Sequence, residues 1–447
     1  MKNNLLKTAV VILLCIAALM ACNQQAAKTD ATVTFTPLTE RTDTIGKGAE
    51  WISVKQLYTK YTDALGKNPN DNMSRIKLAE LYMNEARITG QLTYYYEPAL
   101  ANIDYVEKNK AATKDEVYVA LTYKASILLS LHQFAEAKKV ADEALKYNAY
   151  DAGIYGALVD ANVELGNYKE AIELCDKMLS IRPDLRSYSR ASYLREIFGD
   201  NNGAIDAMQM AVTAGPSGYE STEWARVKLG DLYLNTGKLD SAQLQYALAN
   251  LYRPNYAYAK IGLAKVEKAK RNYAAAIDTT ESVIRNLSEA AFVSFLGELY
   301  ELNGNKDKSS QIHSDVVDLL EQGEKEQADI KFAKHNGNRE LATAYLNNGK
   351  LDEALKYAQQ DLNMRPENID ANQLISWIYY KKGDYANAKT HAAKTLATNI
   401  KNPDIMYKAG LIYAAAGDTD GGNKLMEEAQ KINPNLELAT KRIAKSM

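Results

Sequence analysis

One small residue recurs about every 34 positions, and this recurrence constrains the fold of the 447-residue chain more than any other feature. Six of the eight spacings between successive members are 33 or 34 residues, and the other two are 38 and 45. The members are Ala137, Ala171, Ala204, Ala242, Ala276, Ser309, Ala354, Ala388 and Gly422. Apolar residues around each member recur at helical spacing in two short stretches, and no alternating strand pattern persists. A fixed period of this length indicates a modular array of paired helices.

Other residues recur at fixed places in the same period. Glycine fits the turn between two helices because it adopts a left-handed backbone at least cost. A tyrosine four residues earlier is placed to pack into the hairpin, and a later proline stops the second helix. The glycines are Gly166, Gly199, Gly237, Gly304, Gly349, Gly383 and Gly417, the tyrosines are Tyr233, Tyr300, Tyr345, Tyr379 and Tyr413, and the prolines are Pro183, Pro216, Pro254, Pro366 and Pro434.

This pattern resembles the tetratricopeptide repeat, a 34-residue helical hairpin. Two matching units read LGDLYLNTGKLDSAQLQYALANLYRP and LATAYLNNGKLDEALKYAQQDLNMRP. The resemblance covers residues 74–435 and implies about ten hairpins, of which the first is irregular. It predicts an all-α fold, an α-solenoid superhelix with a long inner groove.

Short segments flank and interrupt the predicted solenoid. Residues 51–73 and 436–447 are predicted to be capping helices, because a terminal hairpin otherwise leaves an apolar face exposed. Insertions are expected at residues 217–220 and 317–338. The second insertion is charged and compatible with a helix, so it is either a lengthened helix, a hinge between two halves or a binding element.

The N-terminus has the form of an export signal. Lys2 and Lys7 precede a 12-residue apolar stretch that is too short to span a bilayer. Residues 1–21 are therefore predicted to be a signal peptide, and the sequence Leu-Met-Ala-Cys at residues 19–22 resembles the lipobox of bacterial lipoproteins. An ordinary secretory peptide with a stray cysteine is the alternative.

The lipobox resemblance implies cleavage before Cys22 and acyl chains, palmitate among them, on its sulfur and nitrogen. Residues 22–50 are rich in threonine and poor in large apolar residues, which predicts a flexible tether. Asn23 is not the aspartate that signals retention at the inner membrane. The expected location is therefore the bacterial cell envelope, as an outer-membrane lipoprotein facing the periplasm or the surface.

Nothing in the sequence indicates catalysis, and we expect no enzyme activity and no cofactor. The four histidines, His132, His313, His335 and His391, are scattered, and none is paired at a metal-ligand spacing. Cys175 lies in an apolar helical pattern, typical of a small buried residue. We therefore predict no metal site. The net charge of -2 also gives no electrostatic footprint for nucleic acid.

The predicted groove suggests a protein partner, bound as a peptide or a helix. Two groups of aromatic residues are candidate anchors, although rings at this spacing are also typical of a core. The candidates are Tyr188, Tyr193 and Trp224 in the middle of the chain, and Trp377, Tyr380 and Tyr407 near its end.

The function expected from these features is that of a lipid-anchored scaffold or adaptor in the cell envelope. The alternative is a glycan-binding lipoprotein of a nutrient-uptake system, since those proteins also combine a lipobox with such repeats. They carry large non-repeat segments that form the sugar site, and no insertion here exceeds about a dozen residues.

Overall fold

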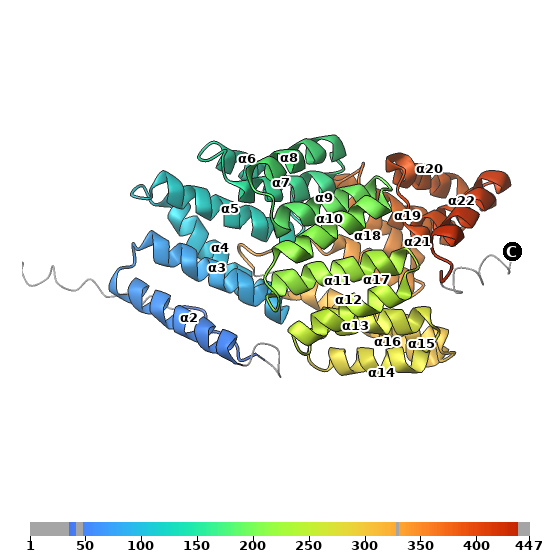
Figure 1. The fold of residues 1–447 in the computed structure, drawn as a ribbon, viewed down its shortest axis with the longest axis horizontal. Coiled ribbons are helices and arrows are strands. Elements are labelled where there is room, and N and C mark those ends of the chain that lie inside the picture. Colours follow the sequence, from blue (N-terminus) through green and yellow to red (C-terminus); the bar gives the residue numbers. More distant parts are fainter. Residues whose placement is uncertain (1–34, 42–47, 328–329, 437–447) are drawn as a thin grey trace, which may run out of the picture.

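The computed structural model describes residues 35–41, 48–327 and 330–436 of the chain (Figure 1). These residues form helices and no strand, and the helices pack in sequential pairs as an α-solenoid. The predicted fold class is therefore confirmed. None of the described helices has the length and apolar character that a bilayer crossing requires.

A leading helix, α2 (Ala49–Lys67), precedes ten helical pairs. The first helices of the pairs are α3 (Asn72–Thr89), α5 (Lys114–Ser130), α7 (Ala152–Leu165), α9 (Leu185–Ile197), α11 (Glu220–Asn235), α13 (Ala257–Ala269), α15 (Ala290–Leu302), α17 (Asn338–Asn347), α19 (Ile369–Lys382) and α21 (Pro403–Ala415). The second helices are α4 (Leu92–Lys108), α6 (Phe134–Leu145), α8 (Tyr168–Ile181), α10 (Asn201–Ala214), α12 (Leu239–Tyr252), α14 (Tyr273–Ile284), α16 (Lys306–Glu326), α18 (Leu351–Met364), α20 (Tyr385–Thr395, continued by the short η2, Leu396–Thr398) and α22 (Thr419–Ile432).

The recurring small residues hold the two helices of each pair together. Every member of the set is buried, and the seven alanines are fully so. At Gly422 even one added carbon would lie 2.5 Å from the carbonyl oxygen of Gly410. The period of the sequence is thus the period of close helix contact.

The turn glycines adopt the backbone that the sequence predicts. In all seven, φ lies between 72° and 90°. Two pairs place another residue at the equivalent position, 34 and 33 residues before the next turn glycine, namely His132 with φ 56° and Arg271 with φ 68°. A side chain in this left-handed region costs about 1–2 kcal/mol relative to an ordinary backbone.

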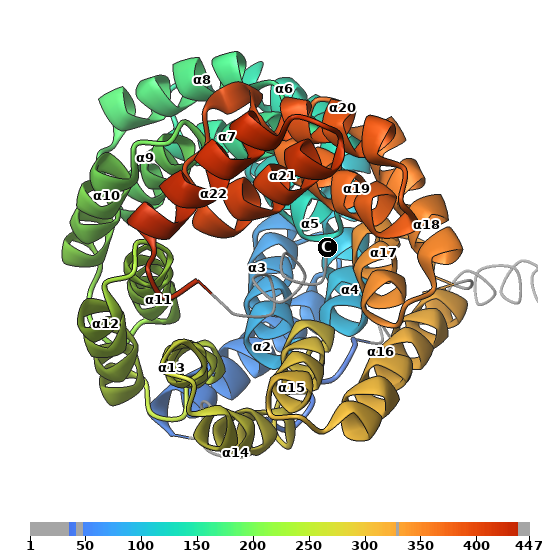
Figure 2. The same ribbon diagram turned by 90° about the vertical axis from the view of Figure 1, so that its right-hand side faces the viewer.

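Figure 2 shows the solenoid along its superhelical axis. First helices such as α11, α13, α15 and α17 line the inside of the ring, and second helices such as α10, α12, α14 and α16 form the outside. Two successive superhelical turns lie against each other. The surface formed by the first helices is called the inner wall below.

A seam of hydrogen bonds joins the two superhelical turns. It pairs the hairpin turns at residues 131–133, 164–168, 199–201 and 234–237 with the loops at residues 334–336, 365–369, 399–401 and 433–435. The amide of Asn336 donates to the carbonyl of Leu131 (2.9 Å), and the side-chain amide of Asn433 donates to the carbonyl of Leu234 (3.1 Å). Partners along the seam are about 200 residues apart in the chain.

Residues 35–41 correct the prediction of a flexible tether over residues 22–50. Arg41 is only 3% exposed, and its guanidinium forms ion pairs with Glu85 (2.6 Å) and Glu50 (2.9 Å). The hydroxyl of Tyr82 donates to the carbonyl of Thr36 (2.7 Å). This segment is held by buried polar contacts, which a low content of large apolar residues does not reveal. The predicted signal peptide and Cys22 lie outside the described residues.

The flanking and inserted segments differ in detail from the sequence prediction. The predicted cap at residues 51–73 corresponds to α2, which packs on α3, but residues 72 and 73 already belong to α3. The predicted C-terminal cap lies outside the described residues except for residue 436. The first part of the 317–338 insertion lengthens α16, and its last part is a loop in which the amides of Phe332 and Ala333 donate to Glu97 (2.9 Å each).

Candidate functional site on the inner wall and the seam

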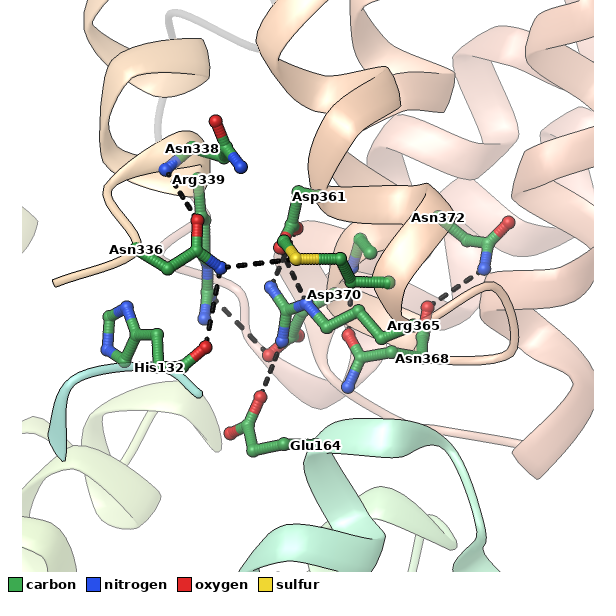
Figure 3. A network of polar contacts seen from close by, with 12 residues as sticks. His132, Glu164, Asn336, Asn338, Arg339, Asp361, Arg365, Asn368, Asp370 and Asn372 are labelled. Carbon is green, nitrogen blue, oxygen red and sulfur yellow. Dashed lines mark hydrogen bonds and ion pairs between the residues drawn. The ribbon is translucent and has the colours of Figure 1, made fainter. Parts of the chain in front are cut away.

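A pocket of about 260 Å³ lies across the seam and contains residues from both superhelical turns (Figure 3). The hairpin turns after α5 and α7 supply one side, and α17 and the end of α18 supply the other. Its lining residues are Leu129, Ser130, His132, Phe134, Asp160, Glu164, Asn336, Arg339, Asp361 and Arg365. This lining is mostly polar and carries both signs of charge.

Arg365 is the centre of the charged network in Figure 3. Its guanidinium donates to both carboxylate oxygens of Asp361 (2.8 Å each) and to Glu164 on the other side of the seam (2.5 Å). The side chain of Arg365 is 2% exposed and that of Asp361 is 4% exposed. Desolvated charges of this kind persist only when they are paired, so the network requires both superhelical turns to be in place.

Burial raises the pKa of Glu164 to about 7, with Asp370 and Asp160 adding to the shift and Arg365 opposing it. Asp361 already neutralises Arg365 through two hydrogen bonds, so the guanidinium does not fully compensate for a second carboxylate. Glu164 therefore changes its charge close to neutral pH. Its protonation state alters the electrostatics of the pocket.

The structure brings together two histidines that are 203 residues apart in the chain. The rings of His132 and His335 lie 4.7 Å apart between centroids, and Nδ1 of His132 is 3.4 Å from Glu340 Oε1. Burial, and secondarily His132, lowers the pKa of His335. The prediction of no metal site considered only ligands that are close in sequence. One ligand atom from each of these three residues lies within 4.8 Å of the other two, which is close enough to surround an ion.

Ion pairs between neighbouring first helices mark the inner wall. They join Asp160 to Arg190 (2.5 Å), Asp231 to Lys265 (3.3 Å), Glu298 to Lys268 (2.5 Å) and Asp370 to Arg339 (3.5 Å). These pairs neutralise one another, so the inner wall is polar without a dominant sign. Such a surface does not select a strongly charged ligand such as nucleic acid.

Family models match three segments of the chain. Residues 128–195 match one tetratricopeptide-repeat model, and residues 339–388 and 374–437 match a second. The chain contains tetratricopeptide repeats. No curated protein matches it.

Two solved structures are similar to the chain at low sequence identity. The crystal structure of the APC/C hetero-tetramer Cut9-Hcn1 has a TM-score of 0.36 and 14% identity, covering 89% of this chain and 93% of that one. A tetratricopeptide repeat protein from Parabacteroides merdae ATCC 43184 has a TM-score of 0.34 and 15% identity, covering 58% of this chain and 97% of that one.

The C-terminal aromatic group is mostly core in these tetratricopeptide hairpins. Tyr380 and Tyr407 are each 4% exposed and pack in the cluster formed by α19 to α22. Trp377 is half-buried and stacks on Tyr380, with ring centroids 4.8 Å apart. Their helical spacing therefore reflects packing, and Tyr380 and Tyr407 do not belong to an accessible partner surface.

The central aromatic group keeps two accessible rings. Tyr193 on α9 is 41% exposed and Trp224 on α11 is 37% exposed, whereas Tyr188 packs against the core of its hairpin. Burial raises the pKa of Tyr193 well above its ordinary value, and Asp370 and Glu164 add to this effect. Tyr193 thus touches solvent while protein from both superhelical turns surrounds it, as expected for a side chain on the inside of the ring.

The sequence could not reveal the seam network of Glu164, Arg365, His132 and His335. Each of these residues lies in a hairpin turn or loop whose neighbours in sequence explain nothing about it. Their meeting depends on the number of hairpins in one superhelical turn. The one local signal was the presence of His132 where other hairpins have glycine.

Proposed function

We propose that this chain is a scaffold that binds a protein partner on the inner wall of its tetratricopeptide superhelix. The observation that carries this proposal is the exposure of Tyr193 and Trp224 on first helices that line the ring. Exposed aromatic rings on a polar, nearly neutral surface are typical anchor points for a peptide or a helix. The repeats supply the rigid support.

The seam restricts how such a partner reaches the inner wall. Because the two superhelical turns are hydrogen-bonded to each other, a chain cannot slide in between them without breaking those bonds. The partner therefore enters along the superhelical axis, as an extended segment or a single helix. A large folded domain would have to dock on the outside.

We extend this proposal to a lipid-anchored scaffold of a bacterial cell envelope. Its support is the lipobox resemblance at residues 19–22, since acylated Cys22 would hold the protein at a membrane through several chains. Metabolic labelling with a palmitate analogue tests the anchor. We expect the wild-type chain to be labelled and Cys22→Ser to remain unlabelled, and equal labelling of both would contradict the anchor.

Site-specific photocrosslinking in cells tests the partner surface. A photoreactive amino acid replaces Tyr193 or Trp224 on the inner wall, and Tyr150 or Leu244 serves as an outer control because these side chains are 86% and 55% exposed. We expect a discrete protein adduct from the inner positions only. Adducts confined to the outer positions would refute the inner-wall proposal.

Binding of Trp224→Ala to the captured partner measures the anchor directly. We expect a loss of about 2 kcal/mol, roughly 30-fold in affinity, because a central aromatic anchor contributes at least this much. Isothermal titration calorimetry gives the dissociation constants, with Leu244→Ala as the control of unchanged affinity. If purified glycans bind the inner wall and Trp224→Ala abolishes that binding, the glycan-uptake alternative replaces the scaffold.

A further inference from the structure

His132, His335 and Glu340 form a ligand set that neither superhelical turn contains alone. His132 lies in the turn between α5 and α6, His335 lies in the loop before α17, and Glu340 lies in the first turn of α17. Their candidate ligand atoms all lie within 4.8 Å of one another. Two imidazoles and one carboxylate are a combination that first-row transition metals bind.

Contacts across the seam hold the backbone of this ligand set in place. The amide of Asn336 donates to the carbonyl of Leu131 (2.9 Å), and its side chain donates to the carbonyl of His132 (3.3 Å). The amide of His335 donates to Gln327 Oε1 (2.7 Å). The ring of Phe134 stacks on the His132 ring at 5.5 Å. The ligands are therefore arranged before any ion arrives, which lowers the entropic cost of binding.

An unpartnered carboxylate oxygen independently indicates a missing ligand. Oε2 of Glu340 is buried and accepts no hydrogen bond from any described residue. The nearby guanidinium groups are already engaged, Arg339 with Asp370 and Arg365 with Asp361 and Glu164. A buried acceptor without a partner costs about 1–3 kcal/mol or more, and a bound cation would remove this cost.

The backbone of His132 adds a second observation. This residue adopts φ 56° at the position where most other hairpins have glycine, so the chain accepts strain in order to place a side chain there. Arg271 does the same in another hairpin, so the strain alone decides nothing. At His132, however, the side chain reaches across the seam to Glu340.

We propose that His132, His335 and Glu340 bind a divalent transition-metal ion, Zn²⁺ in the first instance, which fastens the two superhelical turns together. Tetrahedral Zn²⁺ with bonds of about 2.0–2.1 Å places its ligand atoms roughly 3.3 Å apart. The 3.4 Å between His132 Nδ1 and Glu340 Oε1 already fits, and small side-chain rotations suffice for the remaining ligand atoms. Three protein ligands leave a fourth position for water or for a group of the partner.

Titration of Zn²⁺ against a competing chelator tests the site on the purified full chain after metal has been stripped. We expect one ion per chain, and an affinity that falls by at least about 100-fold in His335→Ala and in Glu340→Gln, because even changes outside the ligand set cost 10–100-fold. His391→Gln is the matched control, since His391 lies on α20 away from the seam. Equal Zn²⁺ affinity in all four proteins would overturn the proposal.

His132→Gly keeps the test valid if another variant misfolds. Glycine is the residue that other hairpins use at this position, so this variant is expected to fold while losing one ligand. Absorption of bound Co²⁺ reports the coordination, and a tetrahedral spectrum that is lost in His132→Gly supports the assignment. An unchanged Co²⁺ spectrum in His132→Gly, with circular dichroism equal to that of the wild type, refutes it.

Hydrogen exchange separates a clamp across the seam from binding elsewhere. Zn²⁺ should slow exchange of the amides at residues 131–133 and 334–336 in the wild type and not in His335→Ala. Protection by Zn²⁺ that is absent from these amides, or that is equal in both proteins, contradicts the proposal. This result does not depend on whether a protein partner binds the inner wall.

Discussion

Arg365 is an arginine enclosed where two superhelical turns meet, and its three charged hydrogen bonds determine what its replacement costs. It is 1% exposed and bonds Asp361 within its own turn and Glu164 in the other. Removing one member of such a network leaves the remaining charge buried without a partner. At the scale of single residues, the seam therefore depends on complete pairing.

Arg365→Met should lower the free energy of unfolding by about 3–5 kcal/mol, because Asp361 then keeps a buried and unpaired charge. The double variant Asp361→Asn with Arg365→Met should recover a large part of this loss. Urea denaturation followed by circular dichroism measures both. The control is Arg182→Met, which removes an exposed pair with Asp184 and should cost less than about 1 kcal/mol. A loss in Arg365→Met no larger than in this control would contradict the prediction.

Glu164 should make stability depend on pH. Because its pKa rises from 4.5 to about 7 on folding, the folded chain keeps a proton that the unfolded chain has released between these values. Folding stability from this group is therefore present at low pH and is lost as the pH rises through this range. Glu164→Gln removes the titration.

The free energy of unfolding of the wild type, minus that of Glu164→Gln, should fall by up to about 3 kcal/mol between pH 4.5 and pH 7.5. Urea denaturation at several pH values gives this difference. A difference that stays constant or increases with pH would show that Glu164 titrates near its ordinary value in the folded chain.

At the scale of elements, much of each hairpin could be predicted from the sequence. The turn glycines and the small residues at the start of the second helices satisfy local requirements, a left-handed backbone and a close helix contact, and local requirements leave a mark in a 34-residue window. Residues 35–41 left no such mark, because Arg41 is held by Glu85 of α3. Tyr380 and Tyr407 show the converse, since a ring facing a groove and a ring facing a core have the same helical spacing.

Arg271 offers a test of the turn rule within one hairpin. It is exposed and has φ 68° at the end of α13, where glycine avoids the strain. Arg271→Gly should raise the free energy of unfolding by about 0.5–1 kcal/mol, since the relief of strain exceeds the added entropy of the unfolded chain. The matched control is Arg285→Gly at the end of α14, where φ is -57° and no gain is expected. Thermal denaturation compares the two, and an equal gain in both would contradict the rule.

At the scale of the whole molecule, the decisive quantity is the offset of about 200 residues between seam partners. It is the sum of many small rotations between hairpins, and no single segment of sequence specifies it. For this reason the pocket, the charged network and the paired histidines could not be predicted, although every hairpin that carries them could be.

Turn glycines in the two superhelical turns should respond differently to alanine. An added carbon at Gly166 would lie 2.5 Å from the backbone of Glu367 across the seam, and one at Gly199 would meet the carbonyl oxygen of Asn399. At Gly383 and Gly417 it would meet nothing within 4 Å. All four have a positive φ, so all four variants share the cost of backbone strain.

Gly166→Ala and Gly199→Ala should therefore lose about 1–3 kcal/mol more stability than Gly383→Ala and Gly417→Ala, because only the first two force the superhelical turns apart. Urea denaturation measures the difference, and small-angle X-ray scattering should show a longer particle only for the first pair. Equal losses and unchanged scattering in all four would mean that the seam is open in solution.

The hydrogen bonds between superhelical turns also give the molecule a mechanical character. It resembles a closely wound spring whose coils already touch, so it resists compression and yields first to tension. A load that pulls the two ends apart would part the coils before any hairpin unravels, and a force-extension trace would begin with that release.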